Sequence, residues 1–127
     1  MPKIDGVIRE LCEKAEFMAI VTNGDDAPHV VANWGDYLRK VGIEPDRIVL
    51  PTGGYRITED NLQRDNRVQV LLASKAVHGT RTPGQGCLIT GTGRIITSGD
   101  DYDRVKAQFP WARGVLIISV EDAVTQL

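Results

Sequence analysis

The sequence predicts a small, mainly β domain whose strands form an antiparallel barrel, closed or nearly closed. Six or seven short apolar runs follow one another along the chain, and most are separated by turns rather than by helices. Connections this short join antiparallel neighbours, and closing the sheet hides its edges. The length of 127 residues is that of one domain, so residues 1–127 are expected to fold as a single unit.

The predicted strands are rich in β-branched and other apolar side chains, which favour a pleated sheet. They cover residues 17–22, 28–34, 47–51, 68–73, 87–97 and 114–120. Residues 37–41 fit either a further strand or one helical turn. Asn23-Gly24, between the first two strands, is typical of a hairpin turn. Gly91 and Gly93 share one face of their strand, which predicts a bend, a bulge or a close backbone approach.

Two or three short helices are expected around the strands. They cover residues 3–15, 58–62 and 98–108. The first has apolar side chains at helical spacing, so one stripe of it faces a core. The second begins at Thr58, whose hydroxyl can cap it, and the third is followed by Pro110, which stops it. Composition predicts a loop at 78–86 and a tail at 121–127.

Composition and charge exclude several classes of protein. The formal net charge is −2 and no basic block occurs, which argues against a nucleic-acid binder. No apolar run approaches the roughly 18 residues of a membrane-spanning helix, and the first residues lack the apolar core of a secretory signal. Cys12 and Cys87 make no disulfide framework, so a cytoplasmic location is expected. His29 and His78 lie far apart without ligand spacing, so no metal site is expected.

Motifs for catalysis by protein groups alone do not stand out. The sequence shows no P-loop, no nucleophile elbow and no Ser/His/Asp order of a triad. A cofactor could carry the chemistry, with the fold supplying orientation and electrostatics.

The first candidate site is the stretch LPTGGYRIT at residues 50–58. A strand ends there, and Gly53 and Gly54 expose backbone amides. Arg56 supplies positive charge, and Thr58 starts a helix. Free amides at a helix N-terminus, a guanidinium and hydroxyls together suit a phosphate group. The alternative is a glycine turn followed by an ordinary capped helix.

Two further stretches concentrate aromatic side chains. In the first, Asn33, Trp34 and Tyr37 could form a flat, polar-edged wall for a ring, or Trp34 could cap one end of the barrel. In the second, Trp111 and Arg113 stand in a loop, where they could be a lid on the core or a contact surface.

These stretches, in their order along the chain, resemble the small FMN-binding proteins of the pyridoxamine 5′-phosphate oxidase-like split-barrel superfamily. The segments that carry the resemblance are MAIVTNGDDAPHVVANW, LPTGGYRITEDNL, RVQVLLASKAVHG, PGQGCLITG and FPWARGVLIISV. The resemblance implies a six-stranded antiparallel split β-barrel, a homodimer, and one FMN per subunit near the interface. A barrel this small is filled by its own side chains, so a ligand outside it would be covered by a second copy.

The resemblance also implies where the flavin lies. Its phosphate would meet Arg56 and Thr58, and its ring would lie against Trp34 and Tyr37 and near Trp111. The expected cofactor-binding residues are Asn33, Trp34, Tyr37, Pro51, Thr52, Gly53, Gly54, Tyr55, Arg56, Thr58 and Trp111.

Two departures from the oxidases refine the expected function. Ile57 and Thr58 stand where the oxidases carry adjacent basic residues, so Arg56 would hold the phosphate charge alone. The tail VEDAVTQL lacks their Arg-x-His pair, so pyridoxamine phosphate oxidation is not expected. The expected function is electron transfer, with a redox protein as partner, or a small flavin-dependent oxidoreductase. The alternatives are a non-catalytic cofactor carrier or sensor, and a split barrel that binds haem or a deazaflavin.

Overall fold

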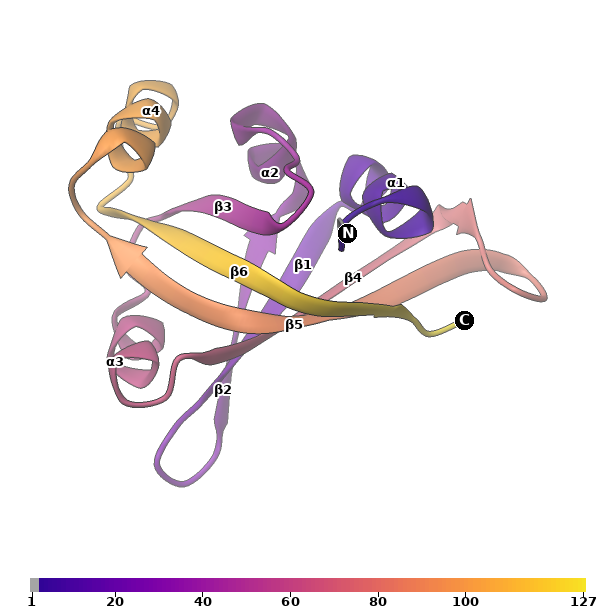
Figure 1. The fold of residues 1–127 in the computed structure, drawn as a ribbon, viewed down its shortest axis with the longest axis horizontal. Coiled ribbons are helices and arrows are strands. Elements are labelled where there is room, and N and C mark those ends of the chain that lie inside the picture. The colour runs from indigo at the N-terminus through magenta and orange to yellow at the C-terminus, as the bar shows by residue number, and fades with distance from the viewer. Residues whose placement is uncertain (1–2) are drawn as a thin grey trace.

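The computed structural model describes residues 3–127, in which six strands form one antiparallel sheet. The strands are β1 (Phe17–Asn23), β2 (Pro28–Trp34), β3 (Arg47–Thr52), β4 (Arg67–His78), β5 (Pro83–Ile96) and β6 (Gly114–Thr125). Their order across the sheet is β2-β1-β4-β5-β6-β3, so β2 and β3 are the edges. The sheet curls into a half-barrel (Figure 1), which confirms the predicted fold class.

Four helices accompany the sheet within the described residues, where the sequence predicted two or three. They are α1 (Gly6–Lys14), α2 (Gly35–Val41), α3 (Arg56–Arg64) and α4 (Asp100–Gln108). The additional one is α2, so residues 37–41 take the helical alternative. Helices α1, α2 and α4 follow one another along one side of the sheet, and α3 lies at the opposite side (Figure 1). No helix within residues 3–127 is long and apolar enough to cross a membrane.

The core has two parts because β3 and residues 114–118 of β6 are buried on both faces. The larger part fills the half-barrel, where Leu11 and Cys12 of α1 pack with inward side chains of the sheet. The smaller part lies between α2, α4 and the other face of β3 and β6. Burial raises the pKa of Cys12 to about 12 and that of Cys87 to about 11, so both thiols stay protonated at neutral pH.

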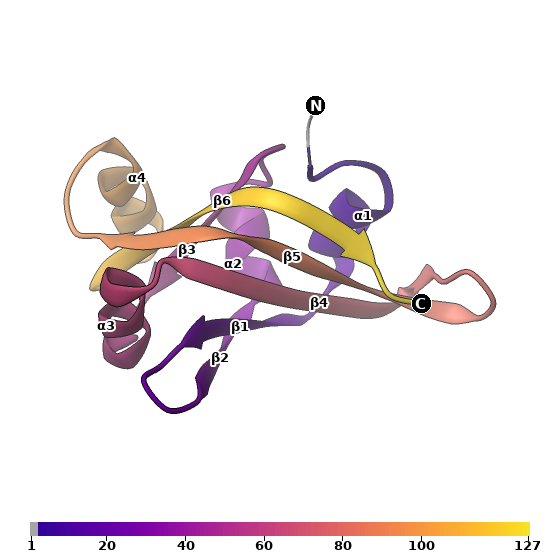
Figure 2. The same cartoon turned by 60° about the horizontal axis from the view of Figure 1, so that its bottom comes forward.

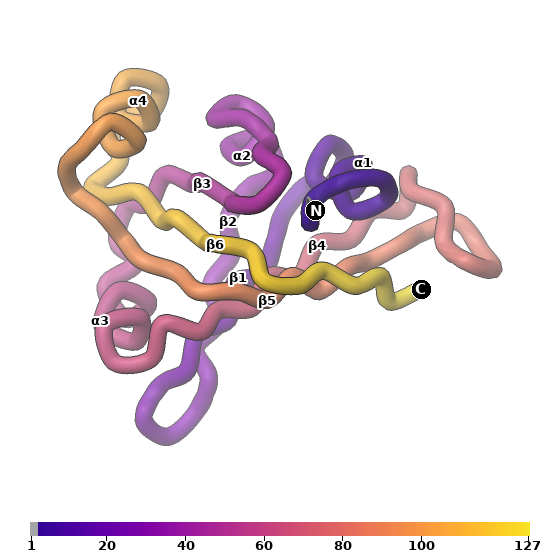
Figure 3. The backbone as a smooth tube through the Cα atoms, in the orientation of Figure 1, coloured from indigo at the N-terminus to yellow at the C-terminus, as the bar shows by residue number. Residues whose placement is uncertain are grey.

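Two predicted boundaries are wrong. The loop expected at 78–86 is shorter, at residues 79–82, because His78 of β4 pairs with Pro83 of β5 and residues 83–86 belong to β5. This hairpin projects beyond α1 (Figures 2 and 3). The tail expected at 121–127 is wrong for residues 121–125, because β6 continues to Thr125. The register shifts between Thr90 and Gly91, which confirms the predicted bulge.

Gly91 is required where the sheet bulges. A Cβ at this position would lie 2.0 Å from the carbonyl oxygen of Ser119 on β6. The two strands can approach this closely only without a side chain.

Candidate functional site

A groove of about 200 Å³ opens where the two edge strands approach each other. Its walls come from the end of β2, the start of α2, the end of β3 and the loops at residues 53–55 and 109–113. The lining residues are Ala32, Asn33, Trp34, Tyr37, Pro51, Gly53, Tyr55 and Trp111. All of them except Ala32 belong to the site predicted from the sequence. Ala32 was missed because a small side chain on an outward strand position carries no chemical signal.

Aromatic side chains form the walls of this groove. Trp34 and Trp111 are half-exposed, at 50% and 53%. The ring of Tyr37 packs 5.6 Å from that of Trp111 and 5.0 Å from that of Phe109. Phe109 is buried, so it supports the two outer rings from behind. Of the two interpretations of Trp34, the exposed wall fits and the cap on the core does not.

Asn33 and Tyr55 bridge the two edges of the sheet at the floor of the groove. The Asn33 Nδ2 donates to the Pro51 carbonyl at 3.2 Å and to the Tyr55 hydroxyl at 3.1 Å. That hydroxyl donates in turn to the Ala32 carbonyl at 2.6 Å. Burial raises the pKa of Tyr55, which keeps the phenol a donor. We call this arrangement the Asn33–Tyr55 bridge.

Tyr55 precedes α3 in a left-handed conformation, with φ of 52°. The predicted helix start at Thr58 is therefore wrong, since α3 begins at Arg56 and no side chain caps it. A non-glycine residue takes this conformation only where its surroundings hold it. The hydrogen bonds of the Asn33–Tyr55 bridge stabilise this conformation of Tyr55. The left-handed residue directs the chain into α3 at the edge of the groove.

The remaining predicted residues lie beside the groove, on the segment 52–58. Gly54 and Arg56 are exposed, and Arg56 has no carboxylate within ion-pair distance among residues 3–127. Thr52 and Thr58 are buried, and the hydroxyl oxygen of each lacks a hydrogen-bond partner within the described chain. The segment 52–58 therefore carries two orphaned hydroxyls and an exposed guanidinium, and it includes the N-terminus of α3, where the helix dipole favours an anion.

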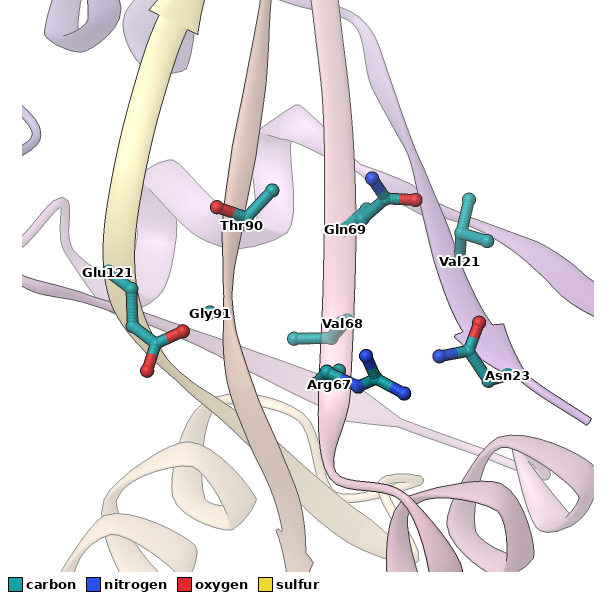
Figure 4. Close-up of a pocket in the computed structure, with 8 residues that line it drawn as sticks. All are labelled: Val21, Asn23, Arg67, Val68, Gln69, Thr90, Gly91 and Glu121. Carbon is teal, nitrogen blue, oxygen red and sulfur yellow. The ribbon is translucent and has the colours of Figure 1, made fainter.

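A second hollow, of about 320 Å³, lies on the outer face of the sheet (Figure 4). Gly91 and the bulge leave this space beside Val21, Gln69 and Thr90, and Arg67 and Glu121 flank it. None of the predicted site residues lines it. Arg67 is paired with Asp65 at 2.7 Å. Among residues 3–127, no three His, Cys, Asp or Glu side chains come together as metal ligands.

Comparison with known proteins assigns the chain to a family. The family model of pyridoxamine 5′-phosphate oxidase matches residues 4–123. The FMN-binding protein of Nitratidesulfovibrio vulgaris (strain DSM 19637 / Miyazaki F) is 39% identical over 120 residues, which cover 94% of this chain and 96% of that protein.

Solved structures share the fold at lower identity. HupZ of Group A Streptococcus superposes with a TM-score of 0.74 at 16% identity, covering 91% of this chain and 88% of that one. An FMN-binding protein from Syntrophomonas wolfei subsp. wolfei superposes with a TM-score of 0.64 at 16% identity, covering 94% and 88%. From the family match and the identity over nearly its whole length, the chain belongs to the pyridoxamine 5′-phosphate oxidase family of split-barrel proteins.

Proposed function

We propose that this chain is a small flavoprotein that binds FMN across the groove and the segment 52–58. The main support for this proposal is that two different surfaces, one aromatic and one positively charged, lie next to each other. An aromatic groove, suited to a flat ring, meets a helix N-terminus with a free guanidinium, suited to a phosphate. A relative of 39% identity is named an FMN-binding protein, which supports the same ligand.

The residues present fit this cofactor. The unpartnered hydroxyls of Thr52 and Thr58 would gain acceptors or donors from the phosphate and the sugar alcohol. Arg56 would supply the positive charge. Trp34, Tyr37 and Trp111 would lie against the ring and exclude water from it, which is how a protein tunes a bound flavin. The flavin itself would supply the electron-transfer chemistry.

We further propose that the protein acts in electron transfer or as a small flavin-dependent oxidoreductase. The half-exposure of Trp34 and Trp111 supports this, since it leaves one side of the groove open to a small substrate or a protein partner. Oxidation of NAD(P)H with an artificial acceptor would separate turnover from a carrier that binds flavin without reacting.

The proposal includes a homodimer that completes the site. A groove of about 200 Å³ is smaller than the roughly 300–1,000 Å³ of sites that enclose a ligand, so one copy covers only part of a flavin. The sheet also carries an outer apolar face, made of register-matched apolar side chains that are exposed or partly exposed. Its members are Phe17, Ala19, Val21, Val30, Ala32, Trp34, Leu71, Leu88 and Val124.

This outer apolar face is continuous with the groove, because Trp34 belongs to both and pairs with Phe17 across the strands. Large contiguous apolar surface on a protein marks a site of interaction. A second copy seated on it would cover part of the flavin that one copy leaves exposed. We also propose a cytoplasmic location, which suits two free, buried cysteines.

The test is the colour of the purified protein. We expect a yellow protein with flavin absorbance, from which heat releases FMN rather than FAD. A colourless protein that takes up no added FMN would overturn the proposal.

A further inference from the structure

Arg113, in the loop before β6, donates hydrogen bonds to three consecutive carbonyl groups of the segment 52–58. Its backbone N–H donates to the carbonyl of Thr52 at 2.8 Å. Its Nε donates to the carbonyl of Gly53 at 3.1 Å, and its Nη2 donates to that of Gly54 at 2.6 Å. All three carbonyls therefore face residue 113.

Peptide geometry fixes where the following amides point. In a trans peptide the C=O and the next N–H lie on opposite sides of the chain, and residues 3–127 contain no cis bond. The amides of Gly53, Gly54 and Tyr55 therefore point away from Arg113. None of the three has a hydrogen-bond acceptor among the described residues. Successive amides that lie free on the same side of the chain can form a nest for an anion.

Arg113 also pairs with the acidic side chain in the first turn of α3. Its Nη2 lies 3.1 Å from the Glu59 Oε1, and both side chains are mostly buried. This pairing neutralises a carboxylate that would otherwise repel an anion at the same helix end. The guanidinium donates Nε and Nη2 to these protein groups, whereas the guanidinium of Arg56 is exposed and has no carboxylate beside it.

We infer that Arg113 is a positioning residue for the phosphate of the flavin. It holds three peptide units so that the amides of Gly53, Gly54 and Tyr55 form the anion nest, and it keeps Glu59 neutralised. The phosphate is contacted by the amides and by Arg56, and Arg113 acts through the loop. The inference rests on the proposed function for the identity of the ligand, but the nest itself is a property of the chain.

The test compares Arg113→Lys with Arg56→Ala and with the control Arg81→Lys, an exposed arginine in the turn between β4 and β5. Lysine keeps the charge but has a single ammonium group, which cannot span two carbonyls and a carboxylate. We expect Arg113→Lys to weaken FMN binding about tenfold and riboflavin binding less than about twofold, because only FMN carries the phosphate. Arg81→Lys should change neither.

Salt separates positioning from direct contact. Arg56→Ala should flatten the dependence of FMN affinity on ionic strength, because it removes a charge that faces the phosphate. Arg113→Lys should leave that dependence as in the wild type. Equal losses of FMN and riboflavin in Arg113→Lys would show a folding role, and a flattened salt dependence would show direct contact. Either result would overturn the inference.

A second readout does not depend on flavin. Titration of the wild-type protein with inorganic phosphate should move the amide resonances of Gly53, Gly54 and Tyr55, and Arg113→Lys should abolish these shifts. If flavin fails to bind but these shifts occur, the proposed function fails and the inference stands. If the three amides do not respond in the wild type, the anion nest is wrong.

Discussion

Arg56 lies on the segment 52–58 and Arg113 contacts this segment from the loop before β6, and their surroundings predict different roles. Arg113 is tied to carbonyls and to Glu59, whereas Arg56 is exposed at the first position of α3. We predict that Arg56→Ala weakens FMN binding by about 1.5–3 kcal/mol, the range of a charge-assisted hydrogen bond. Isothermal titration should show riboflavin nearly indifferent to the change. Equal losses for the two ligands would mean that Arg56 acts on folding.

Tyr55 has a different role, because its hydroxyl joins the two edges of the sheet. Tyr55→Phe removes the donation to the Ala32 carbonyl and the acceptance from Asn33. We predict a loss of about 1–2 kcal/mol in the free energy of unfolding, measured with urea. Tyr102→Phe is the matched control, since Tyr102 is also partly buried but forms no side-chain hydrogen bond to the described residues. A similar loss in both variants would contradict the role of the bridge.

For single residues, the sequence predicted which side chains line the groove better than it predicted their backbone conformation. The residue types of two stretches marked Asn33, Trp34 and Trp111 as candidates, the family resemblance assigned them to the site, and the groove brings them together. Thr58 was expected to cap α3, but the left-handed Tyr55 starts the helix earlier and turns Thr58 inward. Local propensity cannot reveal such a start, because contacts with Asn33, distant in sequence, hold it in place.

At the scale of elements, an ion pair fastens α4 to β3. The Arg47 guanidinium binds the Asp101 carboxylate at 2.8 and 3.0 Å and holds the pKa of that carboxyl at about 2. A lowered pKa in the folded state stabilises the fold above the ordinary pKa of an aspartate, near 4. This stability is lost as the pH falls toward 2.

We therefore predict that Asp101→Asn lowers the free energy of unfolding by about 1–2 kcal/mol near neutral pH, with the difference vanishing near pH 2. Urea titrations at several pH values measure it. Asp103→Asn is the control, because this exposed side chain on the same helix has no cation within ion-pair distance among the described residues. A deficit in Asp101→Asn that stays constant between pH 7 and pH 2 would exclude the linkage.

The bounds of strands with a clear apolar pattern were predicted correctly. The bounds of strands that extend through backbone pairing with a distant strand were not. The strands at 17–22 and 28–34 match β1 and β2 to within one residue. The end of β6 escaped prediction because Glu121 and Asp122 resemble a polar tail. The strand continues past them because the bulge at Gly91 takes up the extra residue. Backbone pairing with a distant strand leaves no local signal in such a stretch.

At the scale of the whole molecule, the outer apolar face would form the contact of the proposed homodimer. Leu71 lies near its centre and is 40% exposed. We predict that the wild type elutes with twice the chain mass of 13.9 kDa and that Leu71→Glu elutes as a monomer with reduced flavin retention. The reason is that a charge buried at an interface is costly. Light scattering at micromolar concentration provides the measurement.

Val7→Glu is the matched control for the assembly experiment. Val7 is 41% exposed, like Leu71, but it lies on α1, away from the outer apolar face. This variant should keep the wild-type mass. A wild type of 13.9 kDa with FMN still bound would refute the shared site and leave a groove served by one subunit.

The position of the groove between the edge strands also has a consequence for the time course of folding. Strand β3 pairs with β6, so residues 47–52 find their partners only at residues 114–119. Contacts between such distant parts of the chain form slowly. Closing a long loop lowers the entropy of the chain before the new contacts contribute any stabilising free energy. The groove joins β2 to the end of β3, so it exists only after this pairing is complete. Flavin would therefore bind only at the last step of folding. The rate at which the fluorescence of added flavin is quenched during refolding would measure the rate of that step.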